Sequence, residues 1–336
     1  MLFSTRPIRL NLKHPFRIAR ETSEYKQNVL VSISDDKFTG IGEAAPSVYY
    51  GENADSVMQV LEEASTFVGD DPFALEATMI RLTSRFPGDS SARAAVDIAL
   101  YDLAAQRLGV PLYRWLGLDP DRTPVTSFTI GIDEPKTVLN KVREAAGYPA
   151  LKIKLGSEKD LKVMHTIRNE TDARIRIDAN GGWTVDQAVE MVKHLSDFDV
   201  ELVEQPLPPG SPKDWNKVHE AAAMPVIADE SVLTSSDVAD IADLADGVNV
   251  KLMKCGGIRE ALRLIHTARA HGMQVMIGCM IESSVAITAA AHLSPLADYA
   301  DLDGNLLITN DPFIGVTVHN GRLVLPQEPG IGVVPR

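Results

Sequence analysis

The stretch ALKIKL at residues 150–155 is followed by RIRIDAN at 174–180 and by VELVEQP at 200–206. Each is a short, mostly apolar run that ends in charged or polar residues, and an amphipathic stretch of helical character separates it from the next. Similar runs recur at TSFTIGI (126–132), PVIADES (225–231), GVNVKL (247–252), QVMIGCM (274–280) and YADLDG (299–304). Eight strands that alternate with helices predict a parallel β/α-barrel, in which every strand is buried on both faces.

The first 120 residues have a different pattern. Residues 2–12, 26–35 and 38–45 alternate apolar and polar positions, as a short antiparallel meander does, and helical periodicity follows at 53–68 and 73–86. The clearest helix is predicted over 91–108, with Ser90 and Ser91 as cap candidates, Gly109 at its end and one apolar stripe.

These patterns predict an α/β protein, a modified TIM (β/α)-barrel with an N-terminal α+β capping domain. We expect the cap at residues 1–120, the barrel at 121–304, and a C-terminal segment at 305–336 that returns to the cap and completes it. An open, doubly wound sheet is the alternative, but eight evenly spaced units without a glycine-rich phosphate turn favour closure.

Composition limits the possible partners. The 336 residues carry a formal net charge of −13, which disfavours nucleic acids and anionic membranes. No run of about 18 apolar residues and no signal peptide is found. The two cysteines make no disulfide framework, so a cytoplasmic location is expected. A small-molecule substrate and a homo-oligomer both remain compatible with the sequence.

Three carboxylates end consecutive predicted strands. Asp178, Glu204 and Asp229 each follow an apolar run and precede a turn, so neighbouring strands bring them to one end of the barrel. Carboxylates held about 3–5 Å apart repel one another unless a cation joins them. Oxygen ligands on rigid strands suit Mg²⁺, which is therefore the predicted cofactor. The alternative is a ring of salt bridges between each carboxylate and a neighbouring lysine.

Lysines flank these carboxylates. Lys152 and Lys154 alternate with apolar residues on the second strand and so point the same way, into the barrel mouth. Lys251 ends the sixth strand, across the barrel. A substrate carbon between the two sides could lose a proton to one lysine and regain it from the other, which is the geometry of a racemase or epimerase. A lysine base needs a pKa below about 10.4. Lys254 is predicted to be a solvated turn residue.

The chain resembles the enolase superfamily, and within it the muconate-lactonizing-enzyme-like subgroup. The resemblance runs over nearly the whole chain and rests on GIGEAAP (40–46), the helix at 91–117, and the barrel motifs KIK, DAN, EQP, ADES and NVKLMKCGG. It implies that Asp178, Glu204 and Asp229 bind Mg²⁺, that Lys154 and Lys251 are the acid/base pair, and that Lys152 helps to bind the substrate carboxylate. GCM at the seventh strand has no histidine, which departs from the mandelate-racemase-like branch.

The eighth strand resembles that of the family's dipeptide epimerases. Asp301 and Asp303 form a D-x-D motif, which in those enzymes binds the free ammonium group of a dipeptide. The segment 275–292 is also similar, with Cys279 and Ile281 at positions that contact the dipeptide backbone, and Thr129 matches a substrate-contacting position. The resemblance therefore implies a dipeptide substrate, with its ammonium group bound by the D-x-D motif and its carboxylate bound by Lys152 and the metal.

One position of the sequence predicts which side chain the second residue of that dipeptide carries. In the Ala-Glu epimerases an arginine lies five residues after the phenylalanine of a P-F segment, whereas here the fifth residue after Phe16 is Glu21. A carboxylate would repel a glutamate substrate, which favours a neutral or cationic second residue. Arg20 could replace the arginine if the loop shifts by one residue. The aromatic Tyr49 and Tyr50 are expected in the other loop that closes the site.

The predicted function is thus an Mg²⁺-dependent dipeptide epimerase that moves the α-proton of the C-terminal residue between two lysines through an enediolate. An N-acylamino acid racemase, or a lyase similar to o-succinylbenzoate synthase, uses the same site on substrates without a free amine. A muconate-type cycloisomerase and a non-catalytic dipeptide-binding barrel are less consistent with the D-x-D motif and the lysine pair.

Overall fold

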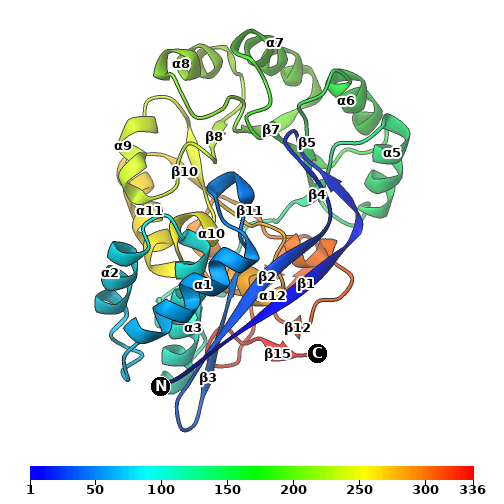
Figure 1. The fold of residues 1–336 in the computed structure, drawn as a ribbon. Helices are drawn as coiled ribbons and strands as arrows, with labels where there is room; N and C mark the ends of the chain where they lie inside the picture. Colours follow the sequence, from blue (N-terminus) through cyan, green and yellow to red (C-terminus); the bar gives the residue numbers. More distant parts are fainter.

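The computed structural model describes residues 1–336 and contains an eight-stranded parallel sheet (Figure 1). Its strands are β4 (Phe128–Ile130), β5 (Ala150–Lys154), β6 (Arg174–Asp178), β7 (Val200–Glu204), β8 (Val226–Ala228), β9 (Gly247–Val250), β10 (Gln274–Gly278) and β11 (Tyr299–Asp301). Neighbours in sequence are neighbours in the sheet. A parallel bridge between Thr126 and Ala300 joins the first and last strands. The sheet is therefore a closed barrel, and the open-sheet alternative was wrong.

Helices surround the barrel and link its strands. They are α5 (Pro135–Glu144), α6 (Asp160–Arg168), α7 (Val185–Leu195), α8 (Pro212–Ala221), α9 (Val238–Ile241), α10 (Leu252–Cys255), α11 (Ile258–Ala270) and α12 (Ser284–Ala291). Figure 1 shows α5 to α8 as an outer arc. Strand β11 is followed only by a 3-10 helix, Gly304–Leu307, so the last β/α unit has no α-helix.

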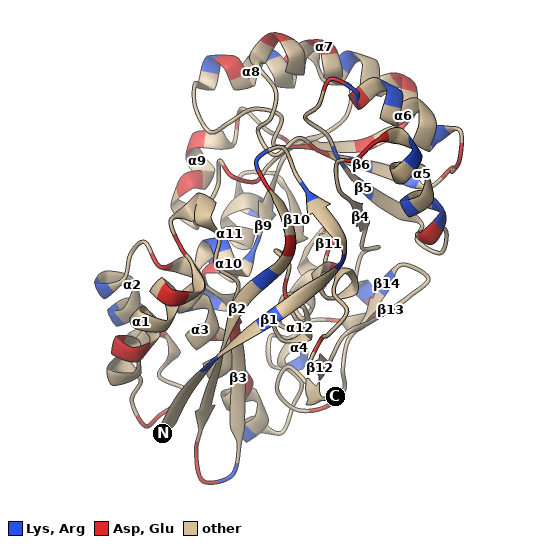
Figure 2. Ribbon diagram, turned by 45° about the vertical axis from the view of Figure 1, so that its right-hand side comes forward, with Lys and Arg blue, Asp and Glu red and all other residues tan.

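The N-terminal unit consists of an antiparallel sheet and a group of helices. Strands β1 (Leu2–Arg17), β2 (Thr22–Ser34) and β3 (Thr39–Ala44) form the sheet, in that order, and the helices are α1 (Ala54–Ala64), α2 (Leu75–Arg85), α3 (Ser90–Leu108) and α4 (Leu112–Trp115). The long β1–β2 hairpin leaves this unit and reaches over the barrel (Figure 2). It is this hairpin that brings cap residues to the ends of the barrel strands.

Helix α3 is buried on every side rather than along one stripe. Residues 91–105 are all buried, because the helix lies between β3 and the barrel helices α10 and α11. Gly40 and Gly42 let β3 approach its backbone, since a Cβ at either would lie within about 2 Å of a carbonyl oxygen of α3. The helix begins at Ser90, and its N-cap residue is Asp89, so the prediction of Ser90 or Ser91 as the cap was wrong.

Buried carboxylates of the N-terminal unit bind backbone amides of the rest of the chain. Asp97 of α3 accepts from Ile258 N at the start of α11 (2.5 Å), and Asp102 accepts from Ile331 N (2.8 Å). Glu43 of β3 accepts from Ser283 N at the start of α12 (2.9 Å). Because a helix N-terminus has unpaired N–H groups and a positive dipole end, Asp97 and Glu43 join the cap to the barrel helices, while Asp102 joins it to the C-terminal segment.

The C-terminal segment returns to the N-terminal unit. It contains β12 (Phe313–Ile314), β13 (Thr317–His319), β14 (Arg322–Val324) and β15 (Val334–Pro335). Leu112 N donates to Gly330 O (2.8 Å). The buried His292 joins three parts: Nδ1 accepts from Tyr113 N (3.1 Å) and Nε2 lies 3.0 Å from Ile331 O. The predicted fold class, a modified barrel with a capping domain completed by the C-terminal segment, is confirmed.

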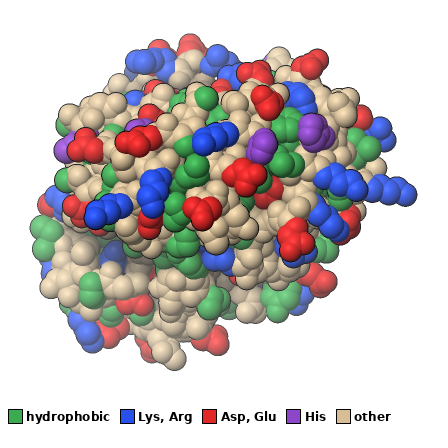
Figure 3. Space-filling model, turned by 90° about the horizontal axis from the view of Figure 1, so that it is seen from above, with side chains coloured by type: hydrophobic (Ala, Val, Ile, Leu, Met, Phe, Trp, Pro, Cys, Tyr) green, Lys and Arg blue, Asp and Glu red, His purple; other side chains and the backbone are tan.

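The outer surface carries both signs of charge. Viewed over the barrel helices, Lys, Arg, Asp and Glu side chains are interspersed rather than gathered by sign (Figure 3). None of the helices combines the length and apolar character that a membrane crossing requires.

Candidate active site

The polar residues predicted from the strand ends lie in one layer. In the sheet register Lys154 pairs with Asp178, and Asp178 pairs with Glu204. Thr129 on β4 pairs with Lys152, and Asp301 ends β11 next to Gly278. Parallel strands of matched register end at the same height, so these side chains meet at the carboxyl end of the barrel.

Three buried carboxylates form the centre of the layer. One oxygen each from Asp178, Glu204 and Asp229 lies within 4.8 Å of the others. Burial, and then the Asp178 carboxylate, raise the pKa of Glu204 to about 8. Glu204 Oε2 and Asp229 Oδ1 accept no hydrogen bond, although a lysine Nζ lies 2.7 and 2.5 Å from them. Crowded negative charge fits a divalent cation, for which all three residues offer hard oxygen ligands.

Lysines surround these carboxylates on opposite walls. Lys154 Nζ donates to Asp178 (2.5 Å), and Lys251 Nζ donates to Asp229 (2.6 Å). Lys154 is on β5, and Lys251 directly follows β9. Three strands, β6 to β8, lie between β5 and β9. In a barrel of eight strands, β5 and β9 are therefore on opposite sides, and the two lysines face each other. These pairs are also the contacts that the salt-bridge alternative predicted.

Lys152 lies deeper than the other two. Its Nζ is 2.6 Å from Asp301, 2.7 Å from Glu204 and 3.0 Å from Asp178. Burial lowers the pKa of Lys152, but the carboxylates, Asp178 first, outweigh burial and raise it well above its ordinary value. Burial also lowers the pKa of Lys251, but Asp229, Glu204 and Glu230 together outweigh burial and raise it. A divalent cation on the carboxylates opposes that effect, which is what a lysine base requires.

Lys254 is not the solvated turn residue that the sequence predicted. It is 3% exposed, and its Nζ donates to Asp229 O (2.6 Å), Val232 O (3.1 Å) and Asn249 O (3.0 Å). The turn that carries it folds back under β8 and β9 as α10, which places the ammonium behind Asp229 instead of in water. The sequence gives no periodic signal for such a contact.

Two amides that the sequence analysis missed orient the carboxylates. Asn249 Nδ2 donates to Glu204 Oε1 (2.8 Å). Gln205, in the left-handed region with φ of 40°, accepts at its Oε1 from Asp229 N (2.8 Å) and Ser231 N (3.2 Å). A non-glycine residue at positive φ is uncommon and costs about 1 kcal/mol or more. Asn249 lies two residues before Lys251 in the same predicted strand, so the period-two alternation of a strand could have predicted that both side chains point into the barrel.

Asp301 and Asp303 lie on the other side of the site, and their charges are satisfied differently. Asp301 pairs with Lys152 and accepts from Ser127 Oγ (2.7 Å). Asp303 accepts from Thr129 N (2.6 Å) and has no lysine or arginine partner. Burial, and then Asp301, raise the pKa of Asp303 to about 7. The site therefore has an uncompensated buried carboxyl group at this end, which favours a cationic ligand group.

The remaining predicted contact residues line the same pocket. It has a cavity volume of about 110 Å³, and Thr129, Cys279 and Ile281 are among its walls. Cys279 Sγ lies 3.2 Å from Asp301 O. Asn28 Nδ2 binds Ile281 O (3.0 Å), so β2 fixes the loop after β10.

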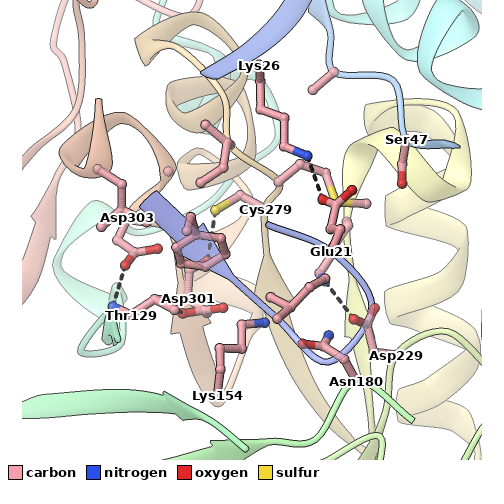
Figure 4. A pocket seen from close by; sticks show the side chains of 18 of the residues that line it. Glu21, Lys26, Ser47, Thr129, Lys154, Asn180, Asp229, Cys279, Asp301 and Asp303 are labelled. Carbon is pink, nitrogen blue, oxygen red and sulfur yellow. Dashed lines mark hydrogen bonds and ion pairs between the residues drawn. The ribbon is translucent and has the colours of Figure 1, made fainter. Parts of the chain in front are cut away.

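The β1–β2 hairpin closes the opposite side. Glu21 forms an ion pair with Lys26 (2.6 Å), and both line the pocket. Arg20 lies over the ring of Tyr49 and binds Glu230 (2.6 Å) and Asn180 O (2.7 Å), which leaves it tied to the barrel. Figure 4 shows Asp301, Asp303 and Thr129 on one side, Glu21, Lys26 and Ser47 on the other, and Lys154 between them.

A barrel mouth with buried acids and bases, covered by a hairpin, is the site of an enzyme. Residues 136–336 match the family model described as "Enolase C-terminal domain-like", and residues 4–117 match "Mandelate racemase / muconate lactonizing enzyme, N-terminal domain". The chain therefore belongs to the mandelate racemase/muconate lactonizing enzyme family of the enolase superfamily.

Relatives within the family define the enzyme class. The chain is 45% identical over 330 residues to an L-Ala-D/L-Glu epimerase of Bacteroides thetaiotaomicron, covering 98% of this chain and 86% of that protein. It is similar to the Enterococcus faecalis dipeptide epimerase complexed with Mg and L-Leu-L-Tyr (TM-score 0.93, 33% identity, 98% of each chain). It is also similar to the N-succinyl Arg/Lys racemase of Bacillus cereus (TM-score 0.94, 26% identity, 99% and 95%). The protein is an isomerase of the epimerase type.

Proposed function

We propose that the protein epimerises dipeptides at the C-terminal residue and that it depends on Mg²⁺. The observation that carries the proposal is that one pocket has two ends of different charge character. The cationic and carboxylate-rich centre receives the substrate carboxylate, and the uncompensated Asp303 receives its free ammonium group. A zwitterion of dipeptide length fits both ends at once.

Asp178, Glu204 and Asp229 would hold the Mg²⁺, whose positive charge stabilises the negative charge that builds on the substrate carboxylate when the adjacent carbon loses its proton. Asn249 and Gln205 keep the ligands in place through the hydrogen bonds described above. Lys152 neutralises part of the remaining charge and aids carboxylate binding.

Lys154 and Lys251 move the proton. The C–H bond of the C-terminal α-carbon breaks, its electron pair stays on the substrate as an enediolate, and the proton goes to the neutral amine of one lysine. The protonated lysine on the other wall then donates a proton to the opposite face, which inverts the centre. Their positions across the barrel give each of them access to one face.

A library of dipeptides in D₂O tests this proposal. Substrates should acquire deuterium at the α-carbon of the C-terminal residue, and the exchange should stop when EDTA removes the metal. If no dipeptide exchanges under any divalent metal, the epimerase proposal is wrong.

The side chain of the second residue lies next to the hairpin. Glu21 and Lys26 neutralise each other there, and Arg20 is occupied by Glu230, so no free cation awaits a carboxylate side chain. We therefore propose a neutral or cationic second residue. Ala-Glu is the competing choice, favoured by the 45% identity to the Bacteroides enzyme and by Lys26, which could bind a glutamate if Glu21 turned away.

An N-acylamino acid racemase is a second candidate. The specific observation in its favour is the ion pair between Asp301 and Lys152. Because Lys152 already neutralises Asp301, only Asp303 is left to bind an ammonium group, and an N-acyl amino acid has no such group. An N-acyl amino acid should exchange faster than the matched dipeptide under this candidate, and slower or not at all under the dipeptide proposal.

The enzyme is proposed to work in the cytoplasm, because Cys255 and Cys279 are both free and a reducing compartment keeps them so.

A further inference from the structure

A second cavity adjoins the active site on the side of Asp303. It has a volume of about 250 Å³ and lies between β1, β4 and α5. Phe16, Thr129 and Leu307 line both this cavity and the catalytic pocket, so the two adjoin at these residues.

The cavity begins next to the group that would bind the substrate ammonium. Thr129 N donates to Asp303 Oδ2 (2.6 Å), and Thr129 belongs to the shared wall. Tyr148, on the far wall, is close enough to Asp303 that burial and this carboxylate together raise its pKa. In a dipeptide the side chain of the first residue is only two bonds from the ammonium nitrogen. A substrate held by Asp303 therefore has that side chain at the cavity entrance.

The walls favour an apolar occupant. The rings of Phe128 and Tyr148 lie 4.7 Å apart and form one side, and Leu12, Leu306 and Leu307 add aliphatic surface. The charged groups at the rim are mostly paired: His14 binds Glu144 (2.9 Å) and Lys141 binds Asp133 (3.2 Å), while Lys13 is exposed to solvent. The cavity thus offers contact area without a free buried charge.

We propose that this cavity receives the side chain of the substrate's first residue, and that the enzyme prefers dipeptides in which this residue is large and apolar or aromatic. The inference rests on the proposed dipeptide epimerase activity. A methyl group fills little of such a space, whereas a leucine or phenylalanine side chain displaces water from it and buries apolar surface.

Wild-type enzyme tests the size dependence directly. Gly-X, Ala-X, Leu-X and Phe-X, with X held at whichever residue exchanges best, are compared by α-deuterium exchange. We expect kcat/KM for Phe-X or Leu-X to exceed that for Ala-X by tenfold or more. A flat series, or one that falls with size, overturns the inference and leaves the epimerase proposal intact. No exchange with any member contradicts the epimerase proposal itself.

Leu306→Trp tests the location, because Leu306 lines this cavity and not the catalytic pocket. The ratio of kcat/KM for Phe-X to that for Ala-X should fall at least tenfold. Leu108→Trp, the same substitution at an exposed residue of the N-terminal unit, is the matched control and should keep the wild-type ratio. An equal loss for both substrates in Leu306→Trp would identify the cavity as a passage to the site and refute the inference. The wild-type size series decides the question if the variant fails to fold.

Discussion

Replacing His292 should remove one contribution to the acid sensitivity of the fold. The imidazole is fully buried, and burial lowers its pKa from 6.5 to about 4, although the contact with Ile331 O raises it slightly. The ring stays neutral in the folded protein because Nδ1 accepts a hydrogen bond from Tyr113 N. In the unfolded chain the same ring takes up a proton near pH 6.5.

The sign and size follow from these two pKa values. Proton uptake by the unfolded chain alone stabilises the unfolded state, so the contribution is fully present above pH 6.5 and is lost as the pH falls towards 4. One pH unit of pKa difference corresponds to about 1.4 kcal/mol, which makes the whole contribution about 3 kcal/mol. About 2 kcal/mol of this disappears between pH 7 and pH 5.

Urea unfolding at pH 7 and pH 5, followed by circular dichroism, measures this loss. His292→Gln keeps an acceptor and a donor but cannot be protonated. The variant should lose about 2 kcal/mol less than the wild type between the two pH values. His266→Gln, at an exposed position on α11, should behave as the wild type does. Equal losses in His292→Gln and the wild type would refute the reasoning, whatever the absolute stability of the variant.

Further predictions concern the site itself. Lys254→Met leaves three backbone carbonyls without their donor and should destabilise the fold by about 3 kcal/mol or more in urea, whereas Lys217→Met on the surface should change little, within about 0.5 kcal/mol. Mg²⁺ at a hundredfold excess over its Kd should stabilise the protein by about 2.7 kcal/mol in a thermal melt, and Glu204→Gln should abolish most of that shift. Lys251→Ala should stop exchange from one C-terminal stereoisomer more than from the other, and equal losses would argue against bases on opposite faces. Asp303→Asn should raise KM for dipeptides about tenfold or more with a smaller effect on kcat, and an unchanged KM would remove Asp303 from ammonium binding.

The sequence was sufficient to predict the barrel and the layer of acids and bases because both depend on local pattern. Apolar runs of strand length, each followed by a polar residue, place Asp178 and Glu204 at strand ends. This placement does not depend on how the helices pack. The register then brings them side by side without further information. The eighth strand was predicted from the same pattern, and Asp301 and Asp303 at its end line one pocket.

Contacts that depend on tertiary neighbours could not be predicted in this way. Lys254 has the composition of a turn residue, and its burial follows from α10 folding back beneath Asp229. The burial of α3 on all sides was hidden because Arg93, Asp97 and Asp102 interrupt its apolar pattern. Each of them has a partner outside the helix: Arg93 donates to Phe86 O and Pro87 O in the turn before it, and the two aspartates accept from backbone amides of α11 and the C-terminal segment.

The complete burial of α3 has a consequence for synthesis. Its partners include Ile258 at the start of α11 and Ile331 near the C-terminus, and 331 minus 108, or 223 residues, separate the end of the helix from the latter. At about 5–20 residues per second, a ribosome needs roughly 10–45 s to deliver them. During that interval β3 can cover one side of the helix, but the side that packs against α10 and α11 has no surface to cover it. Slower, cooler expression or added chaperones should therefore raise the soluble yield, and stalled or truncated chains should aggregate before any barrel forms.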